Sequence, residues 1–407
     1  MSAKDRHRQP AGILRPAPRR RPKRDNDMSK LELIASATFG LEAVVKREIE
    51  ALGYTITDSR DGRLTYTGDE RAIVRSNLWL RCADRVYVKM AEFRAETFEE
   101  LFQQTRALPW ADWIPIDGKF TVIGTSVKSA LHSVPACQSI IKKAIVEKMR
   151  ETYAVETFKE SGAEYTVRFS FMKDVACVMI DTSGEGLHKR GYRTQAVAAP
   201  IKETLAAAMI QLSFFKAGRL LVDPMCGSGT IPIEAALIAR GIAPGLSRSF
   251  ASESWDVIPR EIWKEERRKA FEAIDSEAQV RIIAGDIDKK SVETARENAL
   301  EAGVDDCIEF HVGSLEKRLP TIPEAAGEGR GIIITNPPYG QRIGEREAMD
   351  SIYRSLKQFL KDNEGWSLFM ISSDKSAEKK LGRPADRRRK LYNGNIESCY
   401  YQYHGKK

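Results

Sequence analysis

The spacing of apolar residues divides the chain into two regions of different texture. Over residues 31–181, segments with alternating apolar residues follow segments with helical spacing, which predicts two small α+β units in succession. We expect strands at 31–35, 63–67, 85–93, 119–125, 165–171 and 175–181, the last two forming a hairpin, and helices at 40–51, 70–79, 97–104 and 135–152.

From residue 200 onward, short buried strands alternate with helices. Pro200 is expected to open a helix that runs to about residue 215, because proline suits the first position of a helix. Strands follow at 220–222, 281–284, 308–312, 331–335 and 366–371, helices at 231–240, 289–302 and 348–360, and a terminal hairpin at 390–392 and 396–403. This alternation predicts a doubly wound parallel sheet with an antiparallel hairpin at one edge. Such sheets bind ligands at the carboxyl ends of their strands.

Composition narrows the class of protein. The chain has 407 residues and is 42% hydrophobic, which suits two or three domains with cores of their own. The six cysteines are scattered without a CxxC pair, so we expect neither a zinc site nor a disulfide scaffold, and a reducing cytoplasm fits best. No apolar run is long enough for a transmembrane helix, and no apolar stretch near the N-terminus indicates a secretory signal.

The positive charge is concentrated at the N-terminus. The net charge is +8, and residues 1–27 hold nine Lys/Arg against three Asp, which leaves only +2 for the rest. Four prolines by position 22 predict a disordered basic tail over residues 1–29. Two interpretations of this tail stay open: an arm that binds phosphates, or a dispensable extension ahead of Met28.

A glycine-rich turn follows the first strand of the parallel sheet. It reads Asp223-Pro224-Met225-Cys226-Gly227-Ser228-Gly229-Thr230. Glycines there let a ligand approach the backbone, and the next helix offers its N-terminus. The turn lacks the GK[ST] of a P-loop and the spacing of GxGxxG, which disfavours nucleoside triphosphates and dinucleotides.

Two further motifs follow later strands of the same sheet. Asp286 ends the second strand, where a carboxylate can accept both hydroxyls of a ribose, and Asp288 is placed to cap the next helix. Asn336-Pro337-Pro338-Tyr339 follows the fourth strand. The Asn336 side-chain oxygen and the Pro337 carbonyl can both accept hydrogen bonds from one NH₂ group, and Tyr339 can stack on a flat ring beside it.

Together these motifs resemble the class I S-adenosylmethionine-dependent methyltransferases that methylate amines. The resemblance rests on DPMCGSGT, GDID and NPPYG in this order, and on AAPIKETLAAAM before them. It implies a Rossmann-like domain with a seven-stranded sheet and S-adenosylmethionine as the cofactor. Family members usually carry an acidic residue after the third strand that meets the adenine amine, whereas this chain has Gly313-Ser314. The residues expected at the cofactor are Lys202, Glu203, Asp223, Pro224, Cys226, Gly227, Ser228, Gly229, Thr230, Asp286, Ile287, Gly313, Ser314 and Asn336. The expected catalytic group is Asn336, Pro337, Pro338 and Tyr339.

The first half resembles the THUMP-containing RNA methyltransferases. SGEGLHKRGYR joined to APIKETLAA is similar to the N-terminal part of the bifunctional 23S rRNA guanine-N2 methyltransferase family and to stand-alone bacterial proteins labelled N6-adenine-specific DNA methylases. The expected domains are a tail (1–29), a ferredoxin-like subdomain (30–96), a THUMP domain (97–184) and a methyltransferase domain (185–407).

The resemblance implies methyl transfer to the N2 amine of a guanosine in 23S rRNA. A tRNA guanine, a DNA adenine or a protein glutamine stays open as the acceptor, because NPPY serves all these amines. A non-enzymatic RNA-binding assembly factor also stays open and, more remotely, so does a nicotinamide enzyme. The cations expected to hold RNA phosphates are Lys142, Lys143, Lys189, Arg190, Arg193, Arg387, Arg388 and Arg389. No metal is expected, and the sequence leaves the oligomeric state open.

Overall fold

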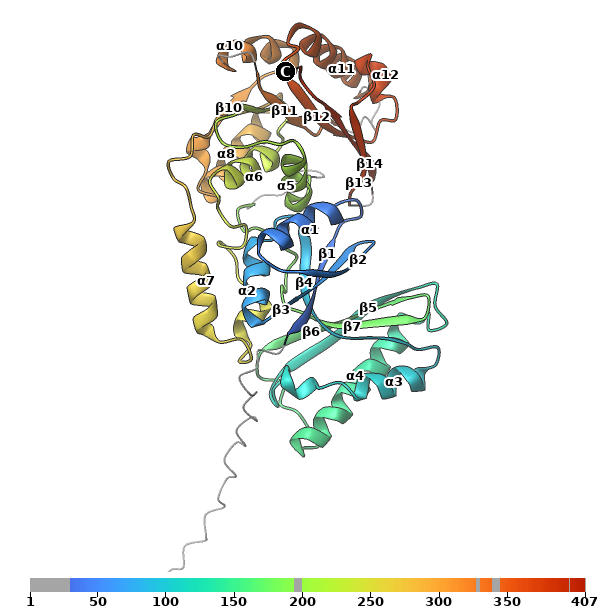
Figure 1. The fold of residues 1–407 in the computed structure, drawn as a ribbon. Coiled ribbons are helices and arrows are strands. Elements are labelled where there is room, and N and C mark those ends of the chain that lie inside the picture. The colour runs from blue at the N-terminus through green and yellow to red at the C-terminus, as the bar shows by residue number, and fades with distance from the viewer. Residues whose placement is uncertain (1–29, 194–199, 327–329, 339–344, 395, 407) are drawn as a thin grey trace, which may run out of the picture.

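The fold has two seven-stranded sheets, which lie one after the other along the long axis of the molecule (Figure 1). The structure is a computed structural model, and it describes residues 30–193, 200–326, 330–338, 345–394 and 396–406. The predicted tail at 1–29 lies outside the described residues. No helix of the described part is long and apolar enough to cross a membrane.

The N-terminal sheet runs through both predicted α+β units as one surface. Its strand order is β2-β3-β1-β4-β7-β6-β5, and β4 pairs with β7 to join the two units. The strands are β1 (Leu31–Ala37), β2 (Ile56–Arg60), β3 (Arg63–Gly68), β4 (Ala83–Arg94), β5 (Lys119–Val127), β6 (Glu164–Met172) and β7 (Val175–Asp181). The helices are α1 (Glu42–Ala51), α2 (Glu70–Trp79), α3 (Phe98–Arg106) and α4 (Val134–Tyr153). The β6–β7 hairpin is confirmed, and β2 is a strand that the spacing does not predict.

The C-terminal sheet confirms the predicted doubly wound parallel arrangement. Its order is β10-β9-β8-β11-β12-β14-β13, with β14 and β13 antiparallel at one edge. The strands are β8 (Leu221–Asp223), β9 (Ile282–Asp286), β10 (Ile308–Val312), β11 (Ile332–Thr335), β12 (Ser367–Ser372), β13 (Arg387–Asn393) and β14 (Ile396–Tyr403). All residues of β8, β11 and β12 are buried, as expected for strands covered on both faces. The chain extends from β8 to β9 on one side and later to β11 on the other, so the sheet has its switch point at β8.

The C-terminal half contains the helices that cover the parallel sheet and also α7, which packs on α2, and a side-chain cap explains the start of α8. The helices of this half are α5 (Glu203–Leu212), α6 (Thr230–Ala239), α7 (Arg260–Glu272), α8 (Lys289–Glu301), α9 (Leu315–Arg318), α10 (Ile322–Ala326), α11 (Glu345–Asp362) and α12 (Ala377–Leu381). Asp288 caps α8 as predicted, because its carboxylate accepts from the backbone N–H groups of Lys290 and Ser291. The prediction that Pro200 opens a helix is wrong: α5 begins at Glu203, and Lys202 is its extended N-cap residue.

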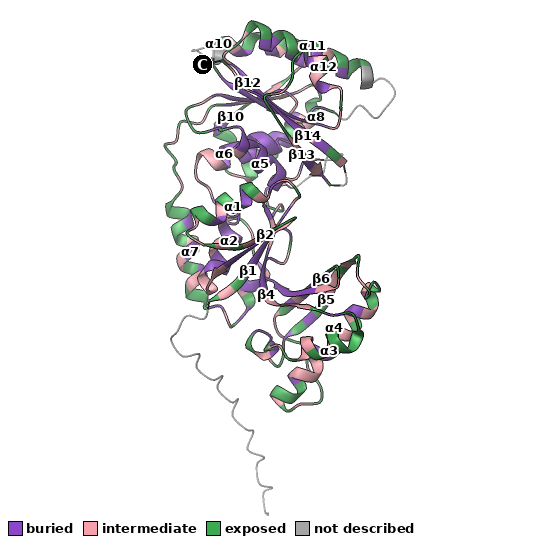
Figure 2. Cartoon of the chain, turned by 45° about the vertical axis from the view of Figure 1, so that its right-hand side comes forward, coloured by how far each residue is buried: buried purple, intermediate pink, exposed green. Residues whose placement is uncertain are grey.

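An insertion between α6 and β9 fastens the two sheets together, and its helix α7 is not predicted by the spacing. Trp255 stacks on Tyr165 of β6 with ring centroids 4.7 Å apart, and its indole N–H donates to the Glu164 carbonyl. On α7, Glu265 and Glu266 pair with Arg71 of α2. Buried hydrophobic residues of both sheets belong to one continuous core (Figure 2). The N-terminal sheet and the C-terminal sheet are therefore held in a defined mutual orientation.

Candidate active site

The carboxyl ends of β9, β8 and β11 meet around a pocket of about 400 Å³, a size usual for cofactor sites. These strands are neighbours in the sheet, so Asp286, Asp223 and Asn336 are brought to one edge, as predicted. The described residues that line the pocket are Pro200, Ile201, Asp223, Pro224, Met225, Cys226, Gly227, Ser228, Thr230, Ile231, Asp286, Ile287, Ser314, Leu315, Glu316, Asn336, Pro337, Pro338, Ala348 and Ile352.

The glycine turn depends on two left-handed backbone conformations. Gly227 has φ +52°, and a Cβ there would meet nothing within 4 Å, which leaves room for a ligand against the backbone. Gly229 has φ +82°, and a Cβ there would come within 2.9 Å of Ala295 on α8. Gly229 lies below the pocket as the N-cap residue of α6 and allows α6 and α8 to pack closely.

Asp223 is a buried carboxylate at the pocket wall. It accepts hydrogen bonds from the Thr335 hydroxyl at 2.9 Å and from the Met225 backbone N–H at 3.3 Å. Burial nevertheless raises the pKa of Asp223 to about 7, and the nearby charge of Asp286 adds to the effect. A cationic ligand beside this group would be favoured, since it would compensate the buried negative charge.

Asp286 joins the second strand to the glycine turn. Its carboxylate accepts from the backbone N–H of Gly227 at 2.9 Å and from that of Asp288 at 3.0 Å. The Cys226 N–H also donates to the Gly285 carbonyl at 2.8 Å. A carboxylate has about four acceptor positions, so Asp286 retains capacity for the hydroxyls of a ligand.

The Asn336-Pro337-Pro338 segment leaves β11 at the opposite wall. The Asn336 side-chain oxygen is buried and has no hydrogen-bond partner among the described residues, although a buried acceptor of this kind costs free energy when left unpaired. Pro337 and Pro338 line the same pocket. Tyr339, the fourth member of the predicted catalytic group, lies outside the described residues.

The end of the third strand supplies two polar side chains. Ser314 lines the pocket, and Gly313 donates its N–H to the Asp286 carbonyl at 2.9 Å from outside the lining. Glu316, which the sequence reasoning missed, also lines the pocket, and the Ser351 hydroxyl donates to its carboxylate at 2.8 Å. An acidic residue two positions after Ser314 is the signal that could have identified it.

Lys202 and Glu203 lie beside the pocket rather than in the described lining. The charge of Lys202 acts on Asp84 and His188, which places its ammonium toward the N-terminal part. Glu203 is buried and pairs with Arg193 at 3.3 Å. Arg193 also donates to the Thr230 hydroxyl at 2.6 Å, so the Arg193–Glu203 pair stabilises the start of α6.

Several lining residues were not among the predicted site residues, although Pro200, Ile201 and Met225 lie within the motifs. These unpredicted residues are Pro200, Ile201, Met225, Ile231, Leu315, Ala348 and Ile352. All are apolar, and nothing in their spacing distinguishes them from core positions. Pro200 and Ile201 precede α5, Ala348 and Ile352 belong to α11, and the others follow the strand ends, so tertiary packing brings them to the pocket.

The predicted RNA-contacting role of Arg190 is wrong. Its side chain is only 3% exposed, and its guanidinium donates to the carbonyls of Leu187 and Arg81 and pairs with Glu234 at 3.3 Å. Arg190 therefore links the N-terminal part to α6 through buried hydrogen bonds and an ion pair. Arg193 is likewise committed to internal acceptors.

The remaining predicted RNA contacts lie on three separate surfaces (Figure 1). Lys142 and Lys143 are exposed on α4, at the end of the molecule away from the pocket. Lys189 pairs with Glu185 in the linker after β7. Arg387, Arg388 and Arg389 follow one another on β13, beside α1. The structure thus divides the predicted cations into distinct patches.

The pocket has a pronounced charge bias. Asp223, Asp286 and Glu316 are carboxylates, and none of the described lining residues is Lys, Arg or His. Phosphate-rich ligands are disfavoured by such a wall, whereas a ligand with positive charge is favoured. With an unpaired acceptor at Asn336, the arrangement can hold a cation on one side and an NH₂ group on the other.

Three family models match consecutive stretches of the chain. The RlmL ferredoxin-like domain matches residues 32–87, the THUMP domain residues 95–181, and the RMKL-like methyltransferase domain residues 190–402. The first two matches fall on the N-terminal sheet and its helices, and the third falls on the parallel sheet that carries the pocket.

Curated relatives and solved structures agree with these matches. The "Putative RNA methyltransferase YpsC" of Bacillus subtilis is 47% identical over 381 residues, covering 93% of this chain and 97% of that protein. The "Ribosomal RNA large subunit methyltransferase K/L" of Syntrophotalea carbinolica is 34% identical, covering 90% of this chain but 52% of that protein. The "Crystal structure of SMU.472, a putative methyltransferase complexed with SAH" has a TM-score of 0.87 and 41% identity, covering 93% of this chain and 99% of that one. The chain therefore belongs to the RMKL-like methyltransferases, with a ferredoxin-like and a THUMP domain ahead of the catalytic domain.

Proposed function

We propose that the protein transfers a methyl group from S-adenosylmethionine to the exocyclic N2 amine of a guanosine in 23S rRNA, in the cytoplasm. The observation that carries the proposal is the buried side-chain oxygen of Asn336, which has no partner in the described part of the chain; Asn336 lines one pocket together with three carboxylates. One wall suits a cationic methyl donor, and the other suits an amine.

The pocket residues fit the cofactor by charge and by space. Asp223 and Asp286 would face its positive groups and its ribose hydroxyls, and the open side of Gly227 accommodates its methionine part. Ser314 and Glu316 line the same pocket and would meet the adenine, and Glu316 would then take the part of the acidic residue expected directly after the third strand. When bound, the cofactor supplies an activated methyl group on a sulfonium.

The chain's own contribution is to hold the amine in line with that methyl group. A guanine N2 amine is a poor nucleophile because its lone pair is delocalised into the ring. Asn336 Oδ1 and the Pro337 carbonyl would accept hydrogen bonds from its two N–H groups and direct the lone pair at the methyl carbon. The N–C bond forms as the C–S bond breaks, and the electron pair of that bond stays on sulfur. The methylated amine would then lose one proton to water, so the transfer needs no strong general base. The preorganised acceptors would therefore supply most of the catalysis.

RNA is favoured as the substrate over DNA or protein. A THUMP domain precedes the catalytic domain, and the relative that is 34% identical is named for the large ribosomal subunit. The target base would leave its stack to enter the pocket. The RNA must therefore be anchored elsewhere on the protein.

Nucleoside mass spectrometry on separated 23S rRNA and tRNA from a deletion strain tests the proposal. We expect N2-methylguanosine to disappear from one position of 23S rRNA and to return with the wild-type gene but not with the Asn336→Ala variant. Loss of a tRNA mark with intact rRNA would overturn the 23S assignment. An unchanged RNA profile together with loss of N6-methyladenine from DNA would overturn RNA as the substrate.

A further inference from the structure

A basic groove crosses the boundary between the ferredoxin-like unit and the edge of the methyltransferase sheet. It has a volume of about 560 Å³ and is distinct from the cofactor pocket. Its lining comes from α1, from the end of α5 and from β13 and β14. The lining residues are Ala43, Lys46, Arg47, Glu50, Gln211, Leu212, Phe214, Arg387, Arg388, Arg389 and Gln402.

The groove has far more positive charge than the chain average. Five of its lining side chains are cationic and one is a carboxylate, whereas all residues after position 27 together carry a net charge of only +2. Lys46 lies 3.8 Å from Glu50, and Arg388 pairs with Glu378. Arg47 and Arg387 are exposed and have no ion pair among the described residues. These two guanidiniums are available for phosphates.

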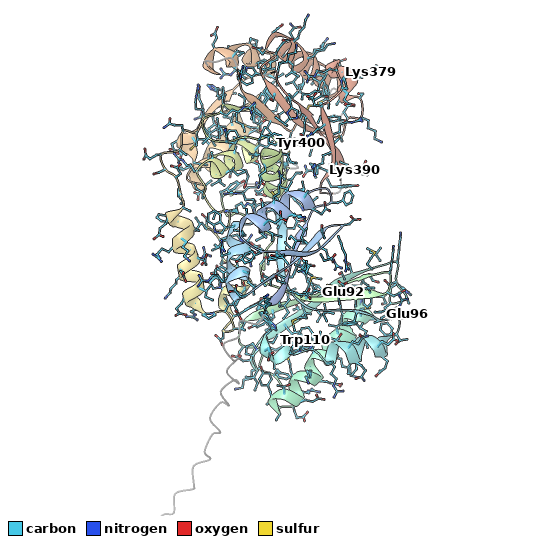
Figure 3. The ribbon with its side chains drawn as sticks, viewed as in Figure 1. Glu92, Glu96, Trp110, Lys379, Lys390 and Tyr400 are labelled. Carbon is cyan, nitrogen blue, oxygen red and sulfur yellow. The ribbon has the colours of Figure 1, made fainter. Side chains whose placement is uncertain are left out.

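The two walls of the groove are fixed against one another. Arg389 donates to the Gly40 carbonyl at 2.8 Å, and a Cβ on Gly40 would come within 2.5 Å of the Lys390 carbonyl. Tyr400 of β14 donates to the Met209 carbonyl of α5 at 2.7 Å (Figure 3). Figure 3 labels Lys390 and Tyr400, which belong to β13 and β14, the two strands that form this wall. The groove is thus a built feature rather than a chance gap between mobile parts.

An exposed aromatic ring stands in this groove. Phe214 is 62% exposed, although Ser213 and Phe215 on either side are buried. Its backbone has φ +59°, in the left-handed region that bulky residues rarely adopt. Such strain is concentrated at functional sites, where the surrounding structure enforces it. Here it turns the ring outward, and the ring of His404 lies 6.3 Å away between centroids.

Phe214 lies at the far end of α5 from the cofactor pocket. Helix α5 has ten residues, so it spans about 15 Å. Its first turn follows Pro200 and Ile201, which line the pocket, and its last turn leads into the groove. The groove is therefore placed to hold a part of the substrate that does not react.

We infer that this groove binds a single-stranded segment of the RNA substrate, with one base stacked on Phe214 and phosphates held by Arg47 and Arg387. The inference rests on the proposed function, because it assigns a second contact to the same substrate. Stacking on an aromatic ring combined with a positively charged track is how proteins bind single strands without reading their sequence. The ferredoxin-like unit thereby becomes part of the RNA-binding surface through α1.

The ring is tested by Phe214→Asn and Phe214→Tyr. Asparagine tolerates a left-handed backbone, so Phe214→Asn removes the ring without adding strain, and Phe214→Tyr keeps the ring. We expect Phe214→Asn to weaken binding of a fluorescein-labelled single-stranded RNA of mixed sequence by about tenfold, the loss of one stacked base. Phe214→Tyr should bind like the wild type. The matched control is Phe271→Asn, which removes a ring that is 71% exposed on α7, across the molecule from β13 (Figure 1).

The cations are tested by the salt dependence of the same anisotropy titration. The double variant Arg47→Ala/Arg387→Ala should make the negative slope of log K against log salt concentration shallower by about 1.4, since each lost phosphate contact on a single strand counts for about 0.7. Lys264→Ala on α7 is the matched control and should leave the slope unchanged. Calorimetry should show the same S-adenosylmethionine affinity in all variants, since none of these residues lines the pocket.

The outcomes separate the two proposals. In one outcome the wild-type protein methylates RNA, but Phe214→Asn and the double variant bind the labelled strand as tightly as the wild type and with the same salt slope. This result would overturn the groove and leave the proposed function intact. A wild-type protein that methylates no RNA but methylates DNA or protein would overturn the proposed function, and the groove with it. Weakened binding by the groove variants, with unchanged binding by the control variants, supports the groove.

Discussion

The carboxylate of Asp286 accepts a hydrogen bond from the backbone N–H of Gly227 at 2.9 Å. This contact ties the end of β9 to the turn that follows β8, although the two residues are 59 positions apart in the sequence. A ligand that bonds to Asp286 therefore meets a carboxylate that is already fixed in place. Preorganisation of this kind lowers the cost of binding.

Replacing Asp286 should weaken cofactor binding in two ways. Asp286→Ala removes the acceptors for the ribose hydroxyls and releases the Gly227 turn, so we expect S-adenosylmethionine affinity to fall by about 1–3 kcal/mol in calorimetry. The control is Asp288→Ala, whose carboxylate caps α8 at the surface. Unchanged affinity in Asp286→Ala would exclude Asp286 as a cofactor ligand.

The buried Asp223 should make the stability of the ligand-free protein depend on pH. Burial raises the pKa of Asp223 to about 7, above its usual value in the unfolded chain. Below about pH 4 both states hold the proton, so the group imposes no penalty there. As the pH rises toward 7 the unfolded state ionises first, and up to about 4 kcal/mol of stability is lost at 1.4 kcal/mol per pKa unit.

The variant Asp223→Asn isolates this effect. Its amide oxygen can still accept from Thr335 and Met225, but it cannot ionise. We expect its melting temperature to exceed that of the wild type at pH 8 and to approach it at pH 5. A constant difference across this range would show that Asp223 does not titrate there. Bound S-adenosylmethionine should reduce the difference at pH 8, because its positive charge compensates the carboxylate.

The motifs could be placed from the sequence because each follows a strand that the apolar pattern marks clearly. Asp223, Asp286 and Asn336 are predicted at strand ends, and the sheet order makes those ends neighbours. The local pattern of apolar and polar residues does not show how the elements pack against one another. The pairing of β4 with β7 merges two predicted units into one sheet, and helix α7 is polar over most of its length because only Trp263, Glu266 and Ala270 are buried.

A charged residue in the sequence is likewise not always exposed to solvent in the structure. Arg190 is predicted as a surface cation because Lys189 and other basic residues surround it, yet it is buried against Glu234 and two carbonyls. Glu316 is overlooked because it stands two positions beyond the place where an acidic residue is expected. The burial of Arg190 depends on side-chain packing that a linear pattern cannot show, whereas the position of Glu316 after the third strand can be read from the sequence.

The Arg190–Glu234 pair should be essential for stability. Both side chains are almost completely buried, and Tyr192 also donates to Glu234 at 3.1 Å. Removing one partner leaves a buried charge unpaired, so Arg190→Met should destabilise the protein by about 3–5 kcal/mol in denaturant unfolding. Lys189→Ala, next in the chain but 57% exposed, should change stability little. A small effect of Arg190→Met would show that the pair is dispensable.

Asn336 should be required for transfer but not for cofactor binding. Its side-chain oxygen is an unpaired acceptor among the described residues of the ligand-free protein, so no internal hydrogen bond of that oxygen is lost in Asn336→Ala. We expect methyl transfer to unmodified 23S rRNA to fall by about 10²–10³, the usual cost of losing one preorganised partner of the transition state. Calorimetric affinity for S-adenosylmethionine should stay within a few-fold of the wild type.

Asn336→Ser is the matched variant for this test. Its hydroxyl can still accept a hydrogen bond but is shorter, so transfer should recover only in part. Such a graded series indicates that the acceptor acts on the amine. If Asn336→Ala instead loses cofactor binding and transfer together, Asn336 belongs to the cofactor site alone, and the amine must be held by other groups, of which the Pro337 carbonyl is the nearest in the chain.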